Sequence, residues 1–110
     1  MSTPGPNPSS SPQAKGPVRG RAPQWNVVVL NDDDHSVPYV VRMLQELFHA
    51  TQDDARKLTE TIDSAGRAVV FTTHKELAEL KVEQVMGYGR DPQLASSKGS
   101  MSAVIEPAVE

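Results

Sequence analysis

Residues 27–34 read Val27-Val28-Val29-Leu30-Asn31-Asp32-Asp33-Asp34. An apolar run that stops at an amide and three carboxylates is typical of a buried strand that emerges at the edge of a sheet. Ser36 and Pro38 follow and predict the start of a helix, because Ser is a favoured N-cap residue and Pro fits the first helical turn. We therefore expect the carboxylates at a fixed corner between a strand and a helix, where they can meet a cation.

The rest of the chain shows the patterns of further helices and strands. Thr51 and Gly66 are placed to cap and to end a second helix, and Thr73 and Glu76 form a capping box that predicts the start of a third. The order β-α-α-β-α-β predicts an α+β domain whose three-stranded antiparallel sheet carries three helices packed on one face. We expect strands at residues 25–30, 67–72 and 101–105, and helices at residues 36–49, 51–66 and 73–87.

Each predicted helix carries an apolar stripe, which we expect to face the sheet. Such a stripe indicates packing and carries no information about function. The predicted stripes comprise Val37, Val40, Val41, Leu44, Leu47 and Phe48 in the first helix, Ala55, Leu58 and Ile62 in the second, and Leu77, Ala78, Val82, Val85 and Met86 in the third.

The first 24 residues differ in composition from the rest. They hold six of the nine prolines, and Ala14 is the only aliphatic residue between Met1 and Val18. Such a segment buries too little apolar surface to offset the entropy of ordering, so we expect residues 1–24 to form a disordered tail and residues 25–110 one domain. The tail carries three basic and no acidic side chains, so the total charge of −3 leaves −6 on residues 25–110.

Composition argues against several classes of protein. The acidic charge of residues 25–110 disfavours binding of nucleic acid, which requires a basic face. Without cysteine there are no disulfides or thiolate metal sites, and no apolar run approaches the ~20 residues of a membrane span. We expect a monomeric cytoplasmic protein that binds no metal, cofactor, nucleic acid or membrane.

The acidic corner admits more than one interpretation. The ordinary one is a solvated turn, since Asn and Asp stabilise turns by bonding their own backbone. Aspartates at a strand end can also hold magnesium for phosphoryl transfer, but no Gly-rich phosphate loop follows a strand here. An EF-hand loop needs a Gly and a Glu at set positions after Asp32, and neither is present. The three histidines, His35, His49 and His74, show no metal-binding or catalytic spacing, so we expect no catalytic residues.

Several segments share a pattern with one known family. They are Trp25 to Asp33, Val40-Val41 with Leu44-Gln45, Gly66-Arg67-Ala68, Glu76 to Val82, and Tyr88. With these residues the chain resembles the ClpS family of adaptors, which feed proteins carrying N-degrons to the Clp protease. The resemblance runs from about Trp25 to Glu106, and it implies a recognition module without catalysis.

The resemblance also implies a binding site. Members of this family bind a Leu, Phe, Tyr or Trp at the N-terminus of another protein. They hold its free α-amino group at positions that match Asn31 and Asp32 and take its side chain in a small apolar pit. Asp33 and His35, beside the corner, are expected at the rim of this pit. A carboxylate and an amide oxygen suit an ammonium group, because both accept its hydrogens.

The partners implied by the resemblance are an unfoldase and its protein substrates. The third helix of the family contacts the AAA+ unfoldase ClpA, at positions that match Glu76 and Lys81. A flexible N-terminal tail takes part in delivery, and residues 1–24 fit that role in length and composition. The alternative is a paralogue of the same fold that has lost or altered N-degron binding and serves as another protein-interaction module.

Two departures from the family pattern concern the site itself. Near the end of the second helix the family usually has a His that binds the amine, and this chain has Asp63, which we expect to supply a second carboxylate. Val37 and Thr59 stand where the family commonly has Met, so we expect a pit of different volume and a shifted preference for the first residue. The expected pit comprises Val37, Val40, Thr59, Ile62 and Met101.

Overall fold

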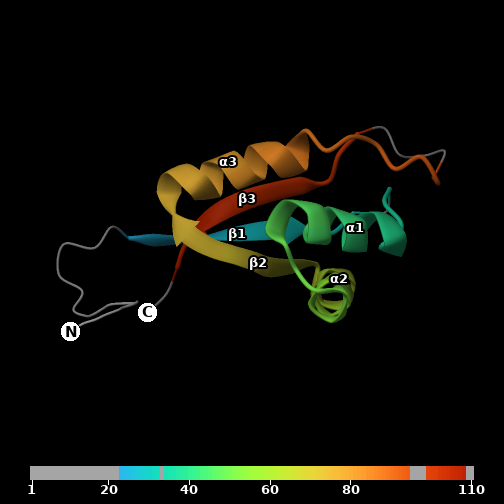
Figure 1. Ribbon diagram of the computed structural model, residues 1–110, viewed down its shortest axis with the longest axis horizontal. Coiled ribbons are helices and arrows are strands. Elements are labelled where there is room, and N and C mark those ends of the chain that lie inside the picture. The colour runs from blue at the N-terminus through green and yellow to red at the C-terminus, as the bar shows by residue number, and fades with distance from the viewer. Residues whose placement is uncertain (1–22, 33, 95–98, 109–110) are drawn as a thin grey trace.

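The structure, a computed structural model, describes residues 23–32, 34–94 and 99–108 (Figure 1). Most of the predicted disordered tail therefore lies outside the described residues. Gln24, which we expected to end that tail, begins the first strand, and its carbonyl accepts a hydrogen bond of 3.0 Å from the backbone N–H of Ala108.

The elements follow the predicted order β-α-α-β-α-β, and the three strands form one antiparallel sheet. The sheet order is β2-β1-β3, so the apolar strand β1 lies in the middle and is covered by a strand on each side. This central position explains why Val27, Val28 and Val29 are fully buried. The elements are β1 Gln24–Leu30, α1 Val37–Phe48, α2 Gln52–Ala65, β2 Arg67–His74, α3 Lys75–Met86 and β3 Ser102–Pro107.

The ends of α1 and α2 are set by the capping residues that the sequence predicts. Ser36 Oγ accepts a hydrogen bond from the N–H of Tyr39, and Thr51 Oγ1 accepts one of 3.1 Å from the N–H of Asp54. Gly66 ends α2 with a φ of 85°, a left-handed conformation that glycine adopts without steric cost.

The predicted cap of α3 was wrong by one residue. Strand β2 continues to His74 because Gln24 and Trp25 of β1 pair with His74 and Thr73, which keeps this backbone extended. His74 is therefore the N-cap residue, and its Nδ1 accepts a hydrogen bond from the N–H of Leu77. Pairing with β1 overrides the local capping box of Thr73 and Glu76.

Helix α3 lies along one face of the sheet and contacts all three strands, while α1 and α2 pack against each other beside it (Figure 1). The predicted stripes are only partly core. Val37 and Met86 are exposed, at 61% and 57% of their accessible surface, because the first lies in the first turn of α1 and the second ends α3. Tyr39 and Met43, which the stripes omitted, are buried instead. Among the described residues, no helix has the length and apolar character needed to span a bilayer.

Candidate functional site

The corner after β1 is the meeting point of three elements. The backbone N–H of Asn31 donates a hydrogen bond of 3.0 Å to the carbonyl of Gly66, which ends α2. This bond brings the end of β1 to the end of α2, and α1 begins six residues after Asn31. Side chains from β1, α1 and α2 therefore converge at one end of the sheet.

A small cavity of about 40 Å³ opens at this corner. It holds eight of the ten residues that we expected to bind or flank an N-terminal residue. Asp32 does not line it, and Asp33 lies outside the described residues. The structure thus brings the expected apolar and polar residues together around one space. The lining comprises Asn31, His35, Val37, Val40, Thr59, Ile62, Asp63 and Met101.

Asp32 does not line the cavity, but it contacts His35, which does. Its Oδ1 accepts a hydrogen bond of 2.9 Å from the N–H of Asp34 and contacts His35 Nδ1 at 2.7 Å. The other ring nitrogen, Nε2, lies 2.7 Å from the carbonyl oxygen of Gly99. The ring of His35 therefore bridges the carboxylate of Asp32 and the backbone of Gly99. Of the two side chains, only His35 lines the cavity.

Asp63 is the acidic residue among those that line the cavity. It is exposed, and within the described part of the chain its carboxylate makes no hydrogen bond or ion pair. The amide of Asn31 is likewise exposed and has no side-chain partner among the described residues. The carboxylate of Asp63 and the amide oxygen of Asn31 can thus accept hydrogen bonds from a ligand next to the apolar walls of the cavity. This arrangement suits a cation attached to an apolar group.

Asp91 is a residue that the sequence analysis placed in a polar loop and assigned no role. It is buried, with 1% of its surface exposed, and it fixes the start of α1. Its Oδ2 accepts a hydrogen bond of 2.6 Å from the N–H of Ser36, and its Oδ1 accepts one of 2.9 Å from the N–H of Gln93. Burial acts to raise the pKa of Asp91, but these hydrogen bonds, with a smaller effect of nearby His35, lower the pKa below its usual value.

The ring of His35 packs against a tyrosine, which in turn packs against a second tyrosine. The ring of Tyr39 lies 4.5 Å from the ring of His35 and 5.4 Å from that of Tyr88, centroid to centroid. The hydroxyl of Tyr39 donates to the carbonyl of Gly89. Burial, with a contribution from Tyr88, raises the pKa of Tyr39, so it remains a neutral donor. These contacts tie the segment after α3 to the first turn of α1.

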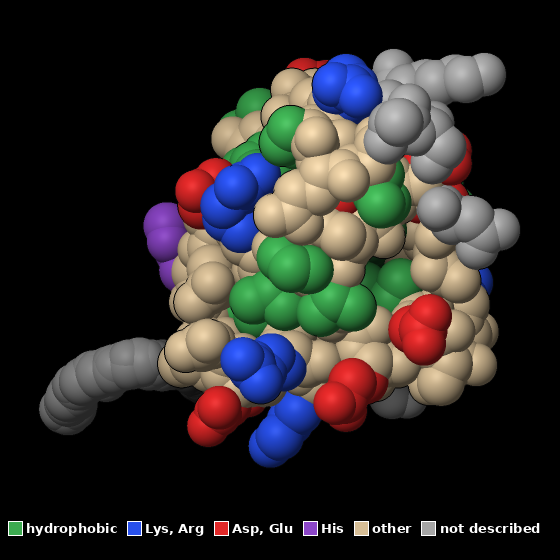
Figure 2. Space-filling model, turned by 90° about the vertical axis from the view of Figure 1, so that its right-hand side faces the viewer, with side chains coloured by type: hydrophobic (Ala, Val, Ile, Leu, Met, Phe, Trp, Pro, Cys, Tyr) green, Lys and Arg blue, Asp and Glu red, His purple; other side chains and the backbone are tan. Residues whose placement is uncertain are grey.

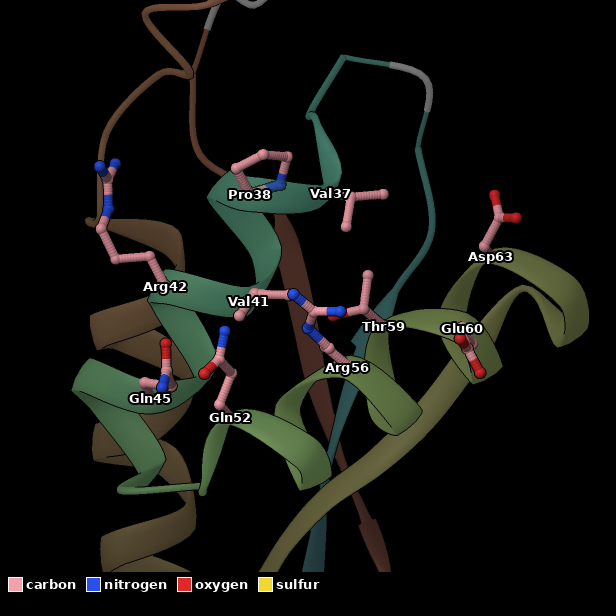
Figure 3. A pocket seen from close by; sticks show the side chains of 10 residues that line it. All are labelled: Val37, Pro38, Val41, Arg42, Gln45, Gln52, Arg56, Thr59, Glu60 and Asp63. Carbon is pink, nitrogen blue, oxygen red and sulfur yellow. The ribbon is translucent and has the colours of Figure 1, made fainter.

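A larger groove of about 590 Å³ lies between α1 and α2 (Figure 3). Three residues, Val37, Thr59 and Asp63, line both this groove and the small cavity. Figure 2 shows the end of the molecule where α1 begins, with hydrophobic side chains in the middle of the face and charged ones along its lower edge. The remaining lining residues of the groove are Pro38, Val41, Arg42, Gln45, Gln52, Arg56 and Glu60.

The two expected docking residues have different surroundings. Glu76 is exposed in the first turn of α3. Lys81 is partly buried: its Nζ donates a hydrogen bond of 2.6 Å to the carbonyl of Leu47 and lies 5.6 Å from the centre of the Phe48 ring. Lys81 therefore serves the fold, because it satisfies one of the last carbonyls of α1.

Clusters of three or more His, Asp or Glu side chains that could hold a metal ion do not occur in residues 23–32, 34–94 and 99–108.

Comparison with known proteins gives consistent matches. The family model described as "ATP-dependent Clp protease adaptor protein ClpS" matches residues 20–95. The ClpS adapter protein of Ruegeria sp. (strain TM1040) is 38% identical over 77 residues, which cover 70% of this chain and 68% of the relative. That of Roseobacter denitrificans is 36% identical over 80 residues, covering 73% and 71%. The structure of Agrobacterium tumefaciens ClpS2 bound to L-phenylalaninamide matches 80% of this chain and all of the other, with a TM-score of 0.69 and 26% identity.

Proposed function

The chain belongs to the ClpS family of ATP-dependent Clp protease adaptors, and we propose that it binds the free N-terminal residue of other proteins at the cavity beside Asn31 and Asp63. The observation that carries the proposal is the cavity itself, in which unoccupied oxygen acceptors stand over apolar walls. The proposed role is recognition without catalysis.

The amine is the part of the ligand that the polar residues select. An α-ammonium group has a pKa of about 7.7–8.0, so it is a cation at neutral pH. Asp63 and the amide oxygen of Asn31 can accept its hydrogens, and a hydrogen bond to a charged group contributes about 1.5–3 kcal/mol. An internal residue of a protein has no such cation, so this requirement restricts binding to a chain terminus.

The side chain of the first residue is the part that the apolar walls select. A space of about 40 Å³ holds roughly three water molecules, which is less than a benzyl group occupies. A bulky side chain therefore needs Val37 or Thr59 to change rotamer, or it extends past them into the groove whose wall they share. The binding of L-phenylalaninamide to ClpS2 supports a bulky apolar first residue, because that ligand joins a free amine to a benzyl group.

The proposal is tested with a short peptide that starts with Phe and carries a fluorophore at its C-terminus. The peptide with a free amine is expected to bind, and the same peptide with an acetylated amine is expected to remain unbound where the first one saturates, because acetylation removes the cation. Fluorescence anisotropy measures both. Equal binding of the two peptides, or binding of neither, would favour the alternative of a paralogue that serves as another interaction module.

We also propose that the bound protein is delivered to a ClpA-type unfoldase through α3. Glu76→Ala is expected to weaken binding to such an unfoldase about threefold, the size typical of an exposed charge pair, without changing peptide affinity. Glu79→Ala is the matched control, since Glu79 is an exposed acid on the next turn of the same helix. An equal loss for both variants in a pull-down titration would place the contact elsewhere.

A further inference from the structure

We propose that the groove between α1 and α2 binds the residues that follow the N-terminal residue of a bound protein. We further propose that Arg56 makes the groove favour acidic side chains at positions three and four, counted from that N-terminus. The inference rests on the proposed function, because it assumes that a polypeptide begins in the small cavity.

The groove continues directly from the cavity. Val37, Thr59 and Asp63 line both spaces, so a chain that leaves the cavity over them enters the groove. Helix α1 begins at the cavity and α2 ends there, so both walls of the groove lead away from it (Figure 3). A ligand whose first residue lies in the cavity therefore has a defined exit path.

The length of the groove suits an extended peptide. Along α2 it is lined from Asp63 back to Gln52, which at 1.5 Å per residue is about 16 Å. An extended chain advances about 3.3 Å per residue, so the groove accommodates roughly four to five residues. Gln45 and Gln52 line its far part, and their amides can donate to and accept from a peptide backbone.

The charged residues of the groove are not distributed evenly. Asp63 and Glu60 lie at the end near the cavity, and Arg42 and Arg56 lie farther along. Nε of Arg42 donates a hydrogen bond of 3.3 Å to the hydroxyl of Tyr88, which raises the pKa of Arg42 and occupies part of the guanidinium. The acidic half of the groove therefore lies next to the proposed amine site. The basic half lies where the later residues of the bound polypeptide would pass.

Arg56 is the cation available to a ligand. Its side chain makes no hydrogen bond or ion pair within the described part of the chain, and it extends from α2 into the space between the helices (Figure 3). It lies two helical turns from Asp63, about 10 Å along the axis, which corresponds to roughly three residues of extended peptide. A carboxylate at the third or fourth position is thus placed to pair with it.

The test uses peptides that start with Phe and carry Asp-Asp, Ser-Ser or Lys-Lys at positions three and four. The wild-type chain is expected to bind the Asp-Asp peptide about fivefold more tightly than the Lys-Lys peptide, as expected of exposed charge pairs. Arg56→Gln is expected to reduce this ratio to less than twofold. Lys57→Gln is the matched control, because it makes the same change of charge at the next, exposed position of α2 outside the groove and is expected to keep the ratio.

L-Phenylalaninamide separates this inference from the proposed function, because it reaches the cavity and not the groove. If the amide binds and the three peptides bind the wild type equally, the inference is wrong and the proposed function stands. A ratio that persists in Arg56→Gln also overturns it. If neither the amide nor any peptide binds, both the inference and the proposed function are wrong.

Discussion

Asp63→Asn is expected to lower the affinity for a peptide that starts with Phe by about tenfold or more, because it removes one charge-assisted hydrogen bond to the ammonium. If the proposed function holds, Asp63 is the residue on which binding of the amine is expected to depend most. Asp32 is bound to His35 and does not line the cavity, so Asp63 is the only acidic side chain among the described residues that line it. Titration by fluorescence anisotropy at neutral pH measures the loss.

Asp53→Asn is the matched control, since it makes the same change on the same helix, in the first turn and away from the cavity. It is expected to leave the affinity unchanged. A loss for Asp63→Asn of less than about twofold, near 0.5 kcal/mol, would contradict the assignment of Asp63 to the amine. Because Asp63 is exposed and unpaired in the described part of the chain, the variant is expected to fold as the wild type does, which circular dichroism can check.

The elements of the fold could be predicted because the sequence patterns that specify them are local. The apolar run of β1, the caps Ser36 and Thr51 and the left-handed Gly66 each determine their neighbourhood through contacts within a few residues. The error at Thr73 has the opposite cause. Its extended backbone depends on pairing with Trp25, almost fifty residues away, which no local pattern records.

The lining of the cavity could be predicted from family resemblance, whereas the contacts of its polar residues could not. Sequence alone places Asp32 and His35 near each other, but the second acceptor of His35 is Gly99, 64 residues along the chain. That contact fixes the ring of His35 between Asp32 and Gly99. The groove was also missed, since it is formed by exposed faces of α1 and α2 that meet only in the folded chain.

Asp91→Ala is expected to lower the free energy of unfolding at pH 7 by about 2–4 kcal/mol, because it removes a buried carboxylate and leaves the partly buried N–H groups of Ser36 and Gln93 without their charged acceptor. For a domain of this size the melting temperature is expected to fall by at least 8 °C. Differential scanning calorimetry measures the shift. Asp53→Asn again serves as control, since Asp53 is exposed and is expected to change the melting temperature little.

Asp91→Asn tests the charge itself through its pH dependence. The pKa of Asp91 is lowered in the folded protein from a usual value of 3.8, so its stabilising effect is complete above that value and is lost as the pH falls through the folded pKa. The stability difference between wild type and Asp91→Asn, measured by urea unfolding, is therefore expected to be large at pH 6–7 and to shrink below about pH 4. A difference that is the same at pH 7 and pH 3 would show that the carboxylate acts by shape alone. Since Asp91 holds the N–H of Ser36, and Val37 and Val40 of the following turn line the cavity, loosening this contact should weaken peptide binding in the same variants.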